Sequence, residues 1–158
     1  MNMAKEIEHK YLINLNKWKT VHPEKSIQIK QGYLSDDPDK TIRIRITDNL
    51  AWLTIKGRNK GAVREEFEHE IDFSLAQLLL EKFCDQVIEK TRHLVHFGQH
   101  VWEVDEFHGE NEGLLVAEIE LQDEDEEYLK PVWLEKNVTD DSNYYNSNLV
   151  KNPFKKWN

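Results

Sequence analysis

The strongest constraint on the fold is a strict alternation of charged and apolar residues in short segments. Between residues 41 and 46, Arg43 and Arg45 alternate with three isoleucines. Because successive side chains of a β-strand point to opposite faces, such a segment forms a sheet with one charged and one apolar face. The same period predicts strands at residues 6–13, 27–33, 41–47, 50–56, 63–71, 87–97, 101–107 and 115–121.

Helix signals are fewer. Ser74 is placed to cap a helix, Gln77 would complete a capping box, and leucines follow at helical spacing. A second, shorter helix is predicted from Asp123 and must end before Pro131. No low-complexity linker or internal repeat divides the chain, so residues 1–158 are expected to form one β-rich (α+β) domain with peripheral helices.

The charged faces are sorted by sign, which a solvated surface does not require. Arg43 and Arg45 share one face, whereas Glu118 and Glu120 share another. For any single strand, an ordinary half-buried sheet with its charges in water explains the pattern. If the sheet closes into a barrel, however, one face of every strand lines the lumen. Buried charges are costly unless a partner offsets them, so a charged lumen predicts a charged ligand.

A triphosphate with divalent metal is a ligand of this kind. Transfer of its terminal phosphoryl group is catalysed mainly by positioning and charge stabilisation, and guanidinium groups suit bidentate contacts with its oxygens. Carboxylates two residues apart on a strand, such as Glu6 and Glu8, point the same way and can share Mg²⁺ or Mn²⁺. The metal would neutralise the phosphates and activate water.

Other function classes are disfavoured. The net charge of −9 argues against a general nucleic-acid or anionic-membrane surface. No apolar run is long enough to span a bilayer, the N-terminus shows no signal-peptide pattern, and the single cysteine, Cys84, excludes an intrachain disulfide. We therefore expect a cytoplasmic protein. Neither a P-loop nor a zinc motif with paired histidines is present.

Taken in order, the motifs resemble the CYTH domain family, the triphosphate tunnel metalloenzymes, in its small single-domain bacterial form. The resemblance covers nearly the whole chain and rests on Glu6-Ile7-Glu8-His9-Lys10, Gln31-Gly32-Tyr33-Leu34, Arg43 with Arg45, Thr54-Ile55-Lys56-Gly57, Arg64-Glu65-Glu66-Phe67-Glu68, Glu89-Lys90-Thr91-Arg92, Glu103-Val104-Asp105, Glu118-Ile119-Glu120 and the run 138–146. It implies a closed eight-stranded antiparallel β-barrel that forms a charged tunnel.

The resemblance also implies roles for individual residues. The expected metal ligands are Glu6, Glu8, Glu118 and Glu120. The expected triphosphate-binding residues are Lys10, Arg43, Arg45, Lys56, Lys90 and Arg92. Supporting tunnel positions match Arg64, Glu66, Glu68, Glu103 and Asp105.

Three residues of the matching motifs are expected to take part in catalysis, namely Glu8, Lys10 and Tyr33. Tyr33 would lie near Lys10 if the first two strands pair, and the two side chains could then deprotonate or orient a water. The alternative for Tyr33 is a packed aromatic residue of the barrel.

The expected substrate is inorganic triphosphate (tripolyphosphate), which needs no base pocket. The alternatives are hydrolysis of ATP, another nucleoside triphosphate or thiamine triphosphate, and cyclisation of ATP by an adenylate cyclase. A non-catalytic polyphosphate-binding or nucleotide-binding module would gain nothing from the four metal-site carboxylates, which would repel its ligand. The aromatic residues Trp133, Phe154 and Trp157 either pack the tail onto the barrel or form a homodimer contact.

Overall fold

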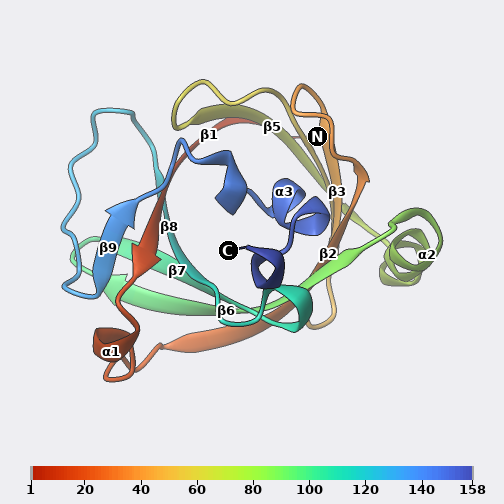
Figure 1. The fold of residues 1–158 in the computed structure, drawn as a ribbon. Helices are drawn as coiled ribbons and strands as arrows, with labels where there is room; N and C mark the ends of the chain where they lie inside the picture. Colours follow the sequence, from red (N-terminus) through yellow and green to blue (C-terminus); the bar gives the residue numbers. More distant parts are fainter. Residues whose placement is uncertain (1, 158) are drawn as a thin grey trace.

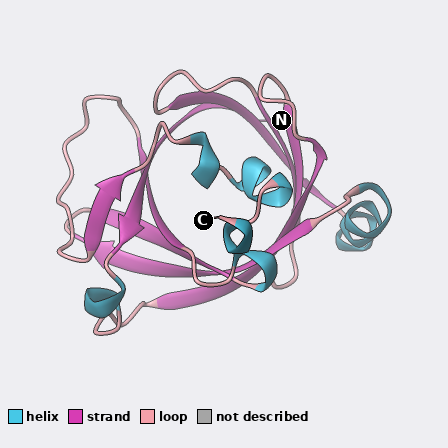
Figure 2. Cartoon of the chain, viewed as in Figure 1, coloured by secondary structure: helices cyan, strands magenta, loops and turns pink. Residues whose placement is uncertain are grey.

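The computed structural model describes residues 2–157, whose strands curl into a closed barrel (Figures 1 and 2). The strands are β1 (Asn2–Ile13), β2 (Lys25–Ser35), β3 (Thr41–Ile46), β4 (Ala51–Lys56), β5 (Val63–Ile71), β6 (Val87–Phe97), β7 (His100–Phe107), β8 (Leu115–Leu121) and β9 (Leu134–Asn137). The α-helices are α1 (Leu15–Trp18), α2 (Phe73–Phe83) and α3 (Asn146–Lys151), and the 3₁₀ helices are η1 (Gly109–Asn111), η2 (Ser142–Tyr144) and η3 (Phe154–Lys156).

Closure of the barrel depends on the length of β1. The sheet order is β5-β4-β3-β2-β6-β7-β8-β1-β9, with an additional pairing of β5 with β1. The first half of β1 pairs with β5 and the second half with β8, both antiparallel. These pairings confirm the predicted eight-stranded antiparallel barrel. β9 is an extra, unpredicted strand that pairs with the C-terminal end of β1.

All eight predicted strands are present, but both helix predictions need correction. The cap of α2 is Asp72, whose carboxylate accepts a hydrogen bond from the Leu75 amide at 3.0 Å, and not Ser74. The helix predicted from Asp123 is absent, since residues 122–131 form turns and irregular chain. There the Glu126 carboxylate accepts a hydrogen bond from the Gln122 amide at 2.7 Å. Such side-chain bonds to local backbone compete with a helix.

The apolar faces of the strands point outward and are largely covered, although Ile55 of β4 is 38% exposed. One buried cluster joins Trp102 and Ile119 of the barrel to Trp133, in the segment before β9. Another places Leu80 of α2 against Ile44 of β3, with Cys84 at its edge. Burial of this apolar area supplies the main favourable free energy of folding. The outer apolar shell therefore holds together a barrel whose inner face is charged.

One end of the barrel is closed by the C-terminal segment, which crosses the ring in Figure 1. Ile88 and Phe107 occupy inward positions at this end, two residues beyond charged positions of their strands. They form a buried cluster with Leu149 of α3, and Phe154 and Trp157 pack against it. The aromatic tail therefore packs onto the barrel. A homodimer stays a prediction.

No helix within residues 2–157 has the length and apolar character needed to cross a membrane.

Candidate active site

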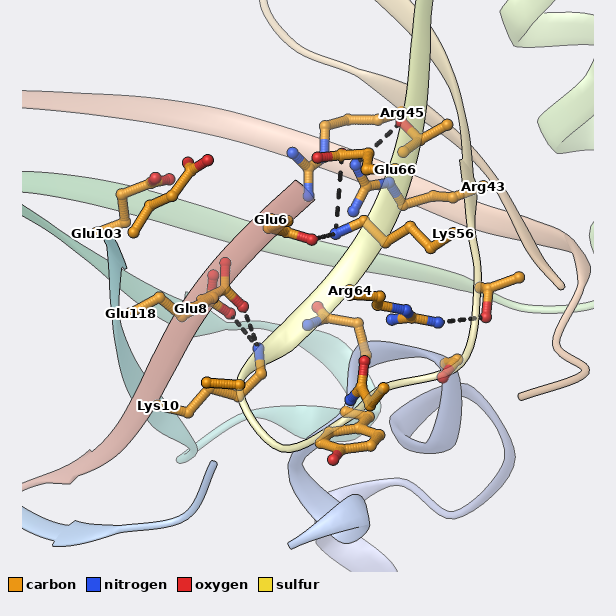
Figure 3. A pocket seen from close by; sticks show the side chains of 18 of the residues that line it. Glu6, Glu8, Lys10, Arg43, Arg45, Lys56, Arg64, Glu66, Glu103 and Glu118 are labelled. Carbon is orange, nitrogen blue, oxygen red and sulfur yellow. Dashed lines mark hydrogen bonds and ion pairs between the residues drawn. The ribbon is translucent and has the colours of Figure 1, made fainter. Parts of the chain in front are cut away.

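A cavity of about 310 Å³ occupies the middle of the barrel (Figure 3). The predicted site residues that line it are Glu6, Glu8, Lys10, Tyr33, Arg43, Arg45, Lys56, Arg64, Glu66, Glu68, Lys90, Arg92, Glu103, Glu118 and Glu120. Asp105 does not line the cavity, because it is fully buried behind Lys90 and Arg92. The alternation seen in the sequence thus places these side chains on one inner surface.

Carboxylates and one lysine meet where β1 pairs with β8. The Lys10 ammonium lies 2.6 Å from a Glu118 oxygen and 3.1 Å from a Glu8 oxygen. Burial and the nearby Glu118 charge raise the pKa of Glu8 to about 8. Burial also opposes ionisation of Glu118, but Lys10 and Arg92 hold the pKa of that carboxyl well below its usual range. Lys10 therefore neutralises the Glu118 carboxylate more fully than the Glu8 carboxylate.

A second lysine stands beside the other predicted metal ligand of β1. The Lys56 ammonium lies 2.6 Å from a Glu6 oxygen and 3.9 Å from a Glu66 oxygen. Burial works against the charge on Glu6, yet Lys56 lowers the pKa of Glu6 below its ordinary value. Burial and neighbouring carboxylates raise the pKa of both Glu66 and Glu120. This side of the cavity therefore has a surplus of negative charge.

Deeper in the wall, a buried network joins β6, β7 and β8. The Lys90 ammonium lies 2.6 Å from an Asp105 oxygen, and both side chains are inaccessible to solvent. Arg92 binds Asp105 through two hydrogen bonds of 2.8 and 2.9 Å and also pairs with Glu103 and Glu118. Burial lowers the pKa of Lys90 to about 7, assisted by Arg92 and opposed by Asp105.

Two arginines of the cavity lack a salt-bridge partner within residues 4–157, namely Arg45 on β3 and Arg64 on β5, where Arg64 is the register neighbour of Glu6. Arg45 donates to the Gln31 side-chain oxygen at 3.0 Å, and Arg64 donates to the Gly57 carbonyl and to the Thr41 hydroxyl. Burial and the Arg43 charge lower the pKa of Arg45 to about 10. Arg43 pairs with Glu68 at 3.6 Å, but its Nε is buried without a hydrogen-bond acceptor among the described residues. Such an unpartnered donor is costly, and an oxyanion in the cavity would satisfy it.

Tyr33 lines the same cavity as Lys10, but the expected reason for their proximity is wrong. β1 pairs with β5, β8 and β9, whereas β2 pairs with β3 and β6. The two side chains therefore line the same cavity from strands that are not neighbours. The Tyr33 hydroxyl accepts a 3.3 Å hydrogen bond from the Gln31 amide, and burial raises the pKa of Tyr33.

The site also contains polar residues that the sequence reasoning did not select. The Asn146 side-chain oxygen accepts hydrogen bonds from Lys90 at 3.1 Å and from Gln31 at 3.2 Å. Tyr145 and Ser147 line the cavity beside it. Gln31 could have been found, because it shares a strand face with Tyr33. Asn146, the first residue of α3, carries no strand periodicity, and only its place at the end of the run 138–146 could have pointed to it.

The donor set suits a hard divalent cation. Glu6, Glu8, Glu118 and Glu120 offer only oxygen donors, as Mg²⁺ and Mn²⁺ prefer, and burial together with the Glu118 charge raises the pKa of Glu8. Within residues 4–157, no three carboxylate, imidazole or thiol side chains converge closely enough to form a ready-made metal site. The Lys10 ammonium instead stands between Glu8 and Glu118. The oxygen donors of these residues therefore suit a divalent metal, and Lys10 supplies positive charge between two of the carboxylates.

Comparisons with known proteins agree with this geometry. The CYTH domain family model matches residues 4–151. An inorganic triphosphatase of Acetivibrio thermocellus is 46% identical over 154 residues, which are 97% of each chain. An inorganic triphosphatase of Nitrosomonas europaea is 30% identical, over 92% of this chain and 96% of that protein.

Solved structures show the same fold. The crystal structure of an inorganic triphosphatase superposes with a TM-score of 0.63 at 27% identity, covering 92% of this chain and 97% of the other. A putative adenylate cyclase from Bacillus halodurans superposes with a TM-score of 0.65 at 15% identity, covering 78% and 84%. At that identity the second likeness concerns the fold alone.

Proposed function

The chain belongs to the CYTH domain family, and we propose that it is a metal-dependent inorganic triphosphatase that cleaves tripolyphosphate to pyrophosphate and phosphate. The observation that carries the proposal is a cavity lined both by a cluster of carboxylates and by guanidinium groups, of which those of Arg45 and Arg64 have no salt-bridge partner within residues 4–157. Two relatives similar over nearly their whole lengths are named for this activity.

The cationic side is suited to bind the phosphates. Among the described residues, Arg45 and Arg64 have no salt-bridge partner to release before they contact an anion, and the buried Nε of Arg43 has no acceptor. Donors fixed in a poorly solvated site stabilise phosphoryl transfer without reorganisation. Lys56, Lys90 and Arg92 line the same cavity and would contact the remaining phosphate oxygens.

The carboxylate side is suited to hold divalent metal. We assign Glu6, Glu8, Glu118 and Glu120 as the residues that would hold Mg²⁺ or Mn²⁺. When bound, the ion supplies charge neutralisation and Lewis acidity. Four carboxylates beside a bare polyanion would be repulsive, which supports a substrate that is bound together with metal.

Lys10 and Tyr33 are assigned to orient the attacking water. Both side chains line the cavity, and the Tyr33 hydroxyl is held by Gln31. Its raised pKa keeps Tyr33 protonated at neutral pH, so the phenol would orient water by a hydrogen bond and would not act as a phenolate base. We place the reaction in the cytoplasm, in keeping with the single buried thiol of Cys84.

The test is phosphate release from tripolyphosphate and from ATP, with Mg²⁺ or Mn²⁺ and with chelator. We expect metal-dependent release from tripolyphosphate that is lost in Glu8→Gln. The matched control is Glu89→Gln, because Glu89 is on the outer face of β6 with a 62% exposed side chain. If wild type binds tripolyphosphate but releases no phosphate, the chain is a binding module and the hydrolase proposal is wrong.

A further inference from the structure

The C-terminal segment contributes one side chain directly to the phosphate-binding residues of the barrel. Asn146 is the first residue of α3, and the buried side chain of Leu149 holds this helix on the barrel. The Asn146 side-chain oxygen accepts hydrogen bonds from Lys90 of β6 and from Gln31 of β2. The segment that covers one end of the barrel is therefore also bonded to the inner wall of the site.

Gln31 is fully buried and uses both ends of its side-chain amide. Its oxygen accepts a hydrogen bond from the Nε of Arg45 at 3.0 Å. Its NH₂ group donates to the Asn146 oxygen at 3.2 Å and to the Tyr33 hydroxyl at 3.3 Å. A single amide therefore holds Arg45, which is assigned to the phosphates, and Tyr33, which is assigned to the attacking water.

The rules for donors and acceptors fix how the two amides are oriented. Guanidinium and ammonium groups donate hydrogen bonds and accept none, whereas an amide has one accepting and one donating end. The oxygen of Gln31 must therefore face Arg45, and the oxygen of Asn146 must face Lys90. The NH₂ group of Gln31 then remains to bind the Asn146 oxygen. Only this arrangement satisfies every contact from one cation to the other.

The arrangement directs the remaining donors of both cations. An ammonium has three N–H donors. Within the part of the chain that the structure describes, Lys90 spends one on Asp105 at 2.6 Å and one on Asn146 at 3.1 Å, which leaves one for a ligand. On Arg45 the bond to Gln31 occupies Nε, so the terminal nitrogens are left for a ligand. Both cations line the cavity, and donors that are oriented before binding stabilise a transition state without reorganisation.

We infer that Gln31 and Asn146 are positioning residues for phosphoryl transfer, which fix the directions of the Arg45 guanidinium and the Lys90 ammonium toward the triphosphate. The inference rests on the proposed function and extends its machinery to α3, outside the barrel strands. Each amide acts through a cation and does not need to touch the reacting phosphate. Because loss of an amide leaves both cationic charges in place, binding of the substrate should change less than stabilisation of the transition state.

The first test compares kcat with KM for tripolyphosphate at saturating Mg²⁺. We expect Asn146→Leu and Gln31→Leu each to lower kcat between about 10-fold and 100-fold, the scale of a hydrogen bond to a charged group, and to change KM less. If folded Asn146→Leu protein keeps the wild-type kcat, or if its loss is confined to KM, the positioning role is refuted.

Matched controls separate positioning from a merely structural role. Asn148 of α3 donates a hydrogen bond to the Ser142 carbonyl at 2.6 Å, and Gln28 of β2 accepts one from Thr91 at 3.1 Å, but neither residue lines the cavity. Asn148→Leu and Gln28→Leu should therefore keep the wild-type kcat even where they lower the free energy of unfolding. Equal losses of kcat in the controls would show that any weakened contact in these segments slows the enzyme, and would overturn the inference.

Double-mutant cycles show whether Asn146 acts through Lys90. Substitutions of residues in contact are usually not additive, whereas those without shared partners usually are. In a Lys90→Met background, Asn146→Leu should therefore lower kcat/KM by less than about threefold. In a Lys56→Met background it should keep its full effect, because within the described residues Lys56 shares no hydrogen-bond or ion-pair partner with Asn146. Equal effects in the two backgrounds would contradict the inference.

The possible failures can be told apart. Asn146 is half-buried and lies outside the barrel strands, so its variants supply the test even if Gln31→Leu does not fold. If wild type hydrolyses tripolyphosphate and Asn146→Leu is equally fast, the positioning role fails and the proposed function stands. If wild type binds tripolyphosphate but releases no phosphate, the proposed function fails and the cycles are read from the dissociation constant. Coupling of Asn146 with Lys90 alone would then support the positioning role, and additive effects would refute it.

Discussion

Removal of the charge of Arg45 should stabilise the ligand-free protein and weaken triphosphate binding. In the folded state the pKa of Arg45 is lowered to about 10 by burial and by Arg43. A lowered pKa of a cationic group means that folding disfavours its charged form. This penalty is fully present at pH 7 and is relieved only as the pH rises through the folded-state value. The guanidinium charge is therefore held in the cavity at the expense of stability.

The magnitude follows from the linkage between pKa and stability. At about 1.4 kcal/mol per pKa unit, the charge of Arg45 destabilises the folded state by about 3 kcal/mol. Substitution by Met also removes the hydrogen bond to Gln31, a loss of about 1 kcal/mol. We expect Arg45→Met to raise the free energy of unfolding by about 2 kcal/mol.

Urea denaturation and tripolyphosphate binding form the assay. Arg92→Met is the contrasting variant, because it breaks the pairs of Arg92 with Asp105, Glu103 and Glu118. Loss of one partner from a buried network should lower the free energy of unfolding by about 3–5 kcal/mol. Both variants should bind tripolyphosphate more weakly than wild type. If Arg45→Met destabilises the ligand-free protein, or binds tripolyphosphate as tightly as wild type, the reasoning about an unpaired cation is refuted.

Three further predictions concern stability, each measured by urea denaturation. Because the pKa of Glu8 is raised to about 8, its ionised form is disfavoured by folding, so Glu8→Gln should gain stability relative to wild type as the pH rises from about 5 to 8; parallel pH profiles would contradict this. Gly32→Ala should destabilise by about 1–3 kcal/mol, since a β-carbon there would lie 2.8 Å from Cys84 atoms, whereas Gly57→Ala, with 4.0 Å of space, should have little effect. Asp72→Ala should lower the free energy of unfolding by about 1 kcal/mol and Ser74→Ala should not; the reverse order would restore Ser74 as the cap of α2.

The strands and their inner face could be predicted because alternation is a local property of the chain. Arg43 and Arg45 lie between isoleucines, and that pattern assigns their side of the sheet before any partner strand is known. The neighbours of each strand could not be obtained in this way. β1 does not pair with β2, although they are consecutive, because its two halves complete the barrel against β5 and β8. Closure is a property of the whole sheet, which no single segment records.

The difference between a local pattern and the arrangement of the whole chain also explains which site residues the sequence did not reveal. Asn146 reaches Lys90 and Gln31 only because the C-terminal segment folds across one end of the barrel. The prediction of a helix from Asp123 was wrong for a related reason, because His100 and the Gln122 amide both contact the Glu126 carboxylate. In each case a contact distant in sequence or an irregular turn outweighed the local pattern.

The near balance of charge inside the barrel explains how one inner surface can be stable without a ligand and still bind a polyanion. Lys10 and Lys56 neutralise Glu118 and Glu6 in the ligand-free protein, so these buried carboxylates stay ionised. A triphosphate alone would attract both lysines away from their partners and leave the carboxylates uncompensated, at a cost comparable to the attraction gained. A triphosphate that arrives with divalent cations leaves both groups paired. The metal requirement that we propose therefore rests on the pairing of the lysines as well as on the carboxylates.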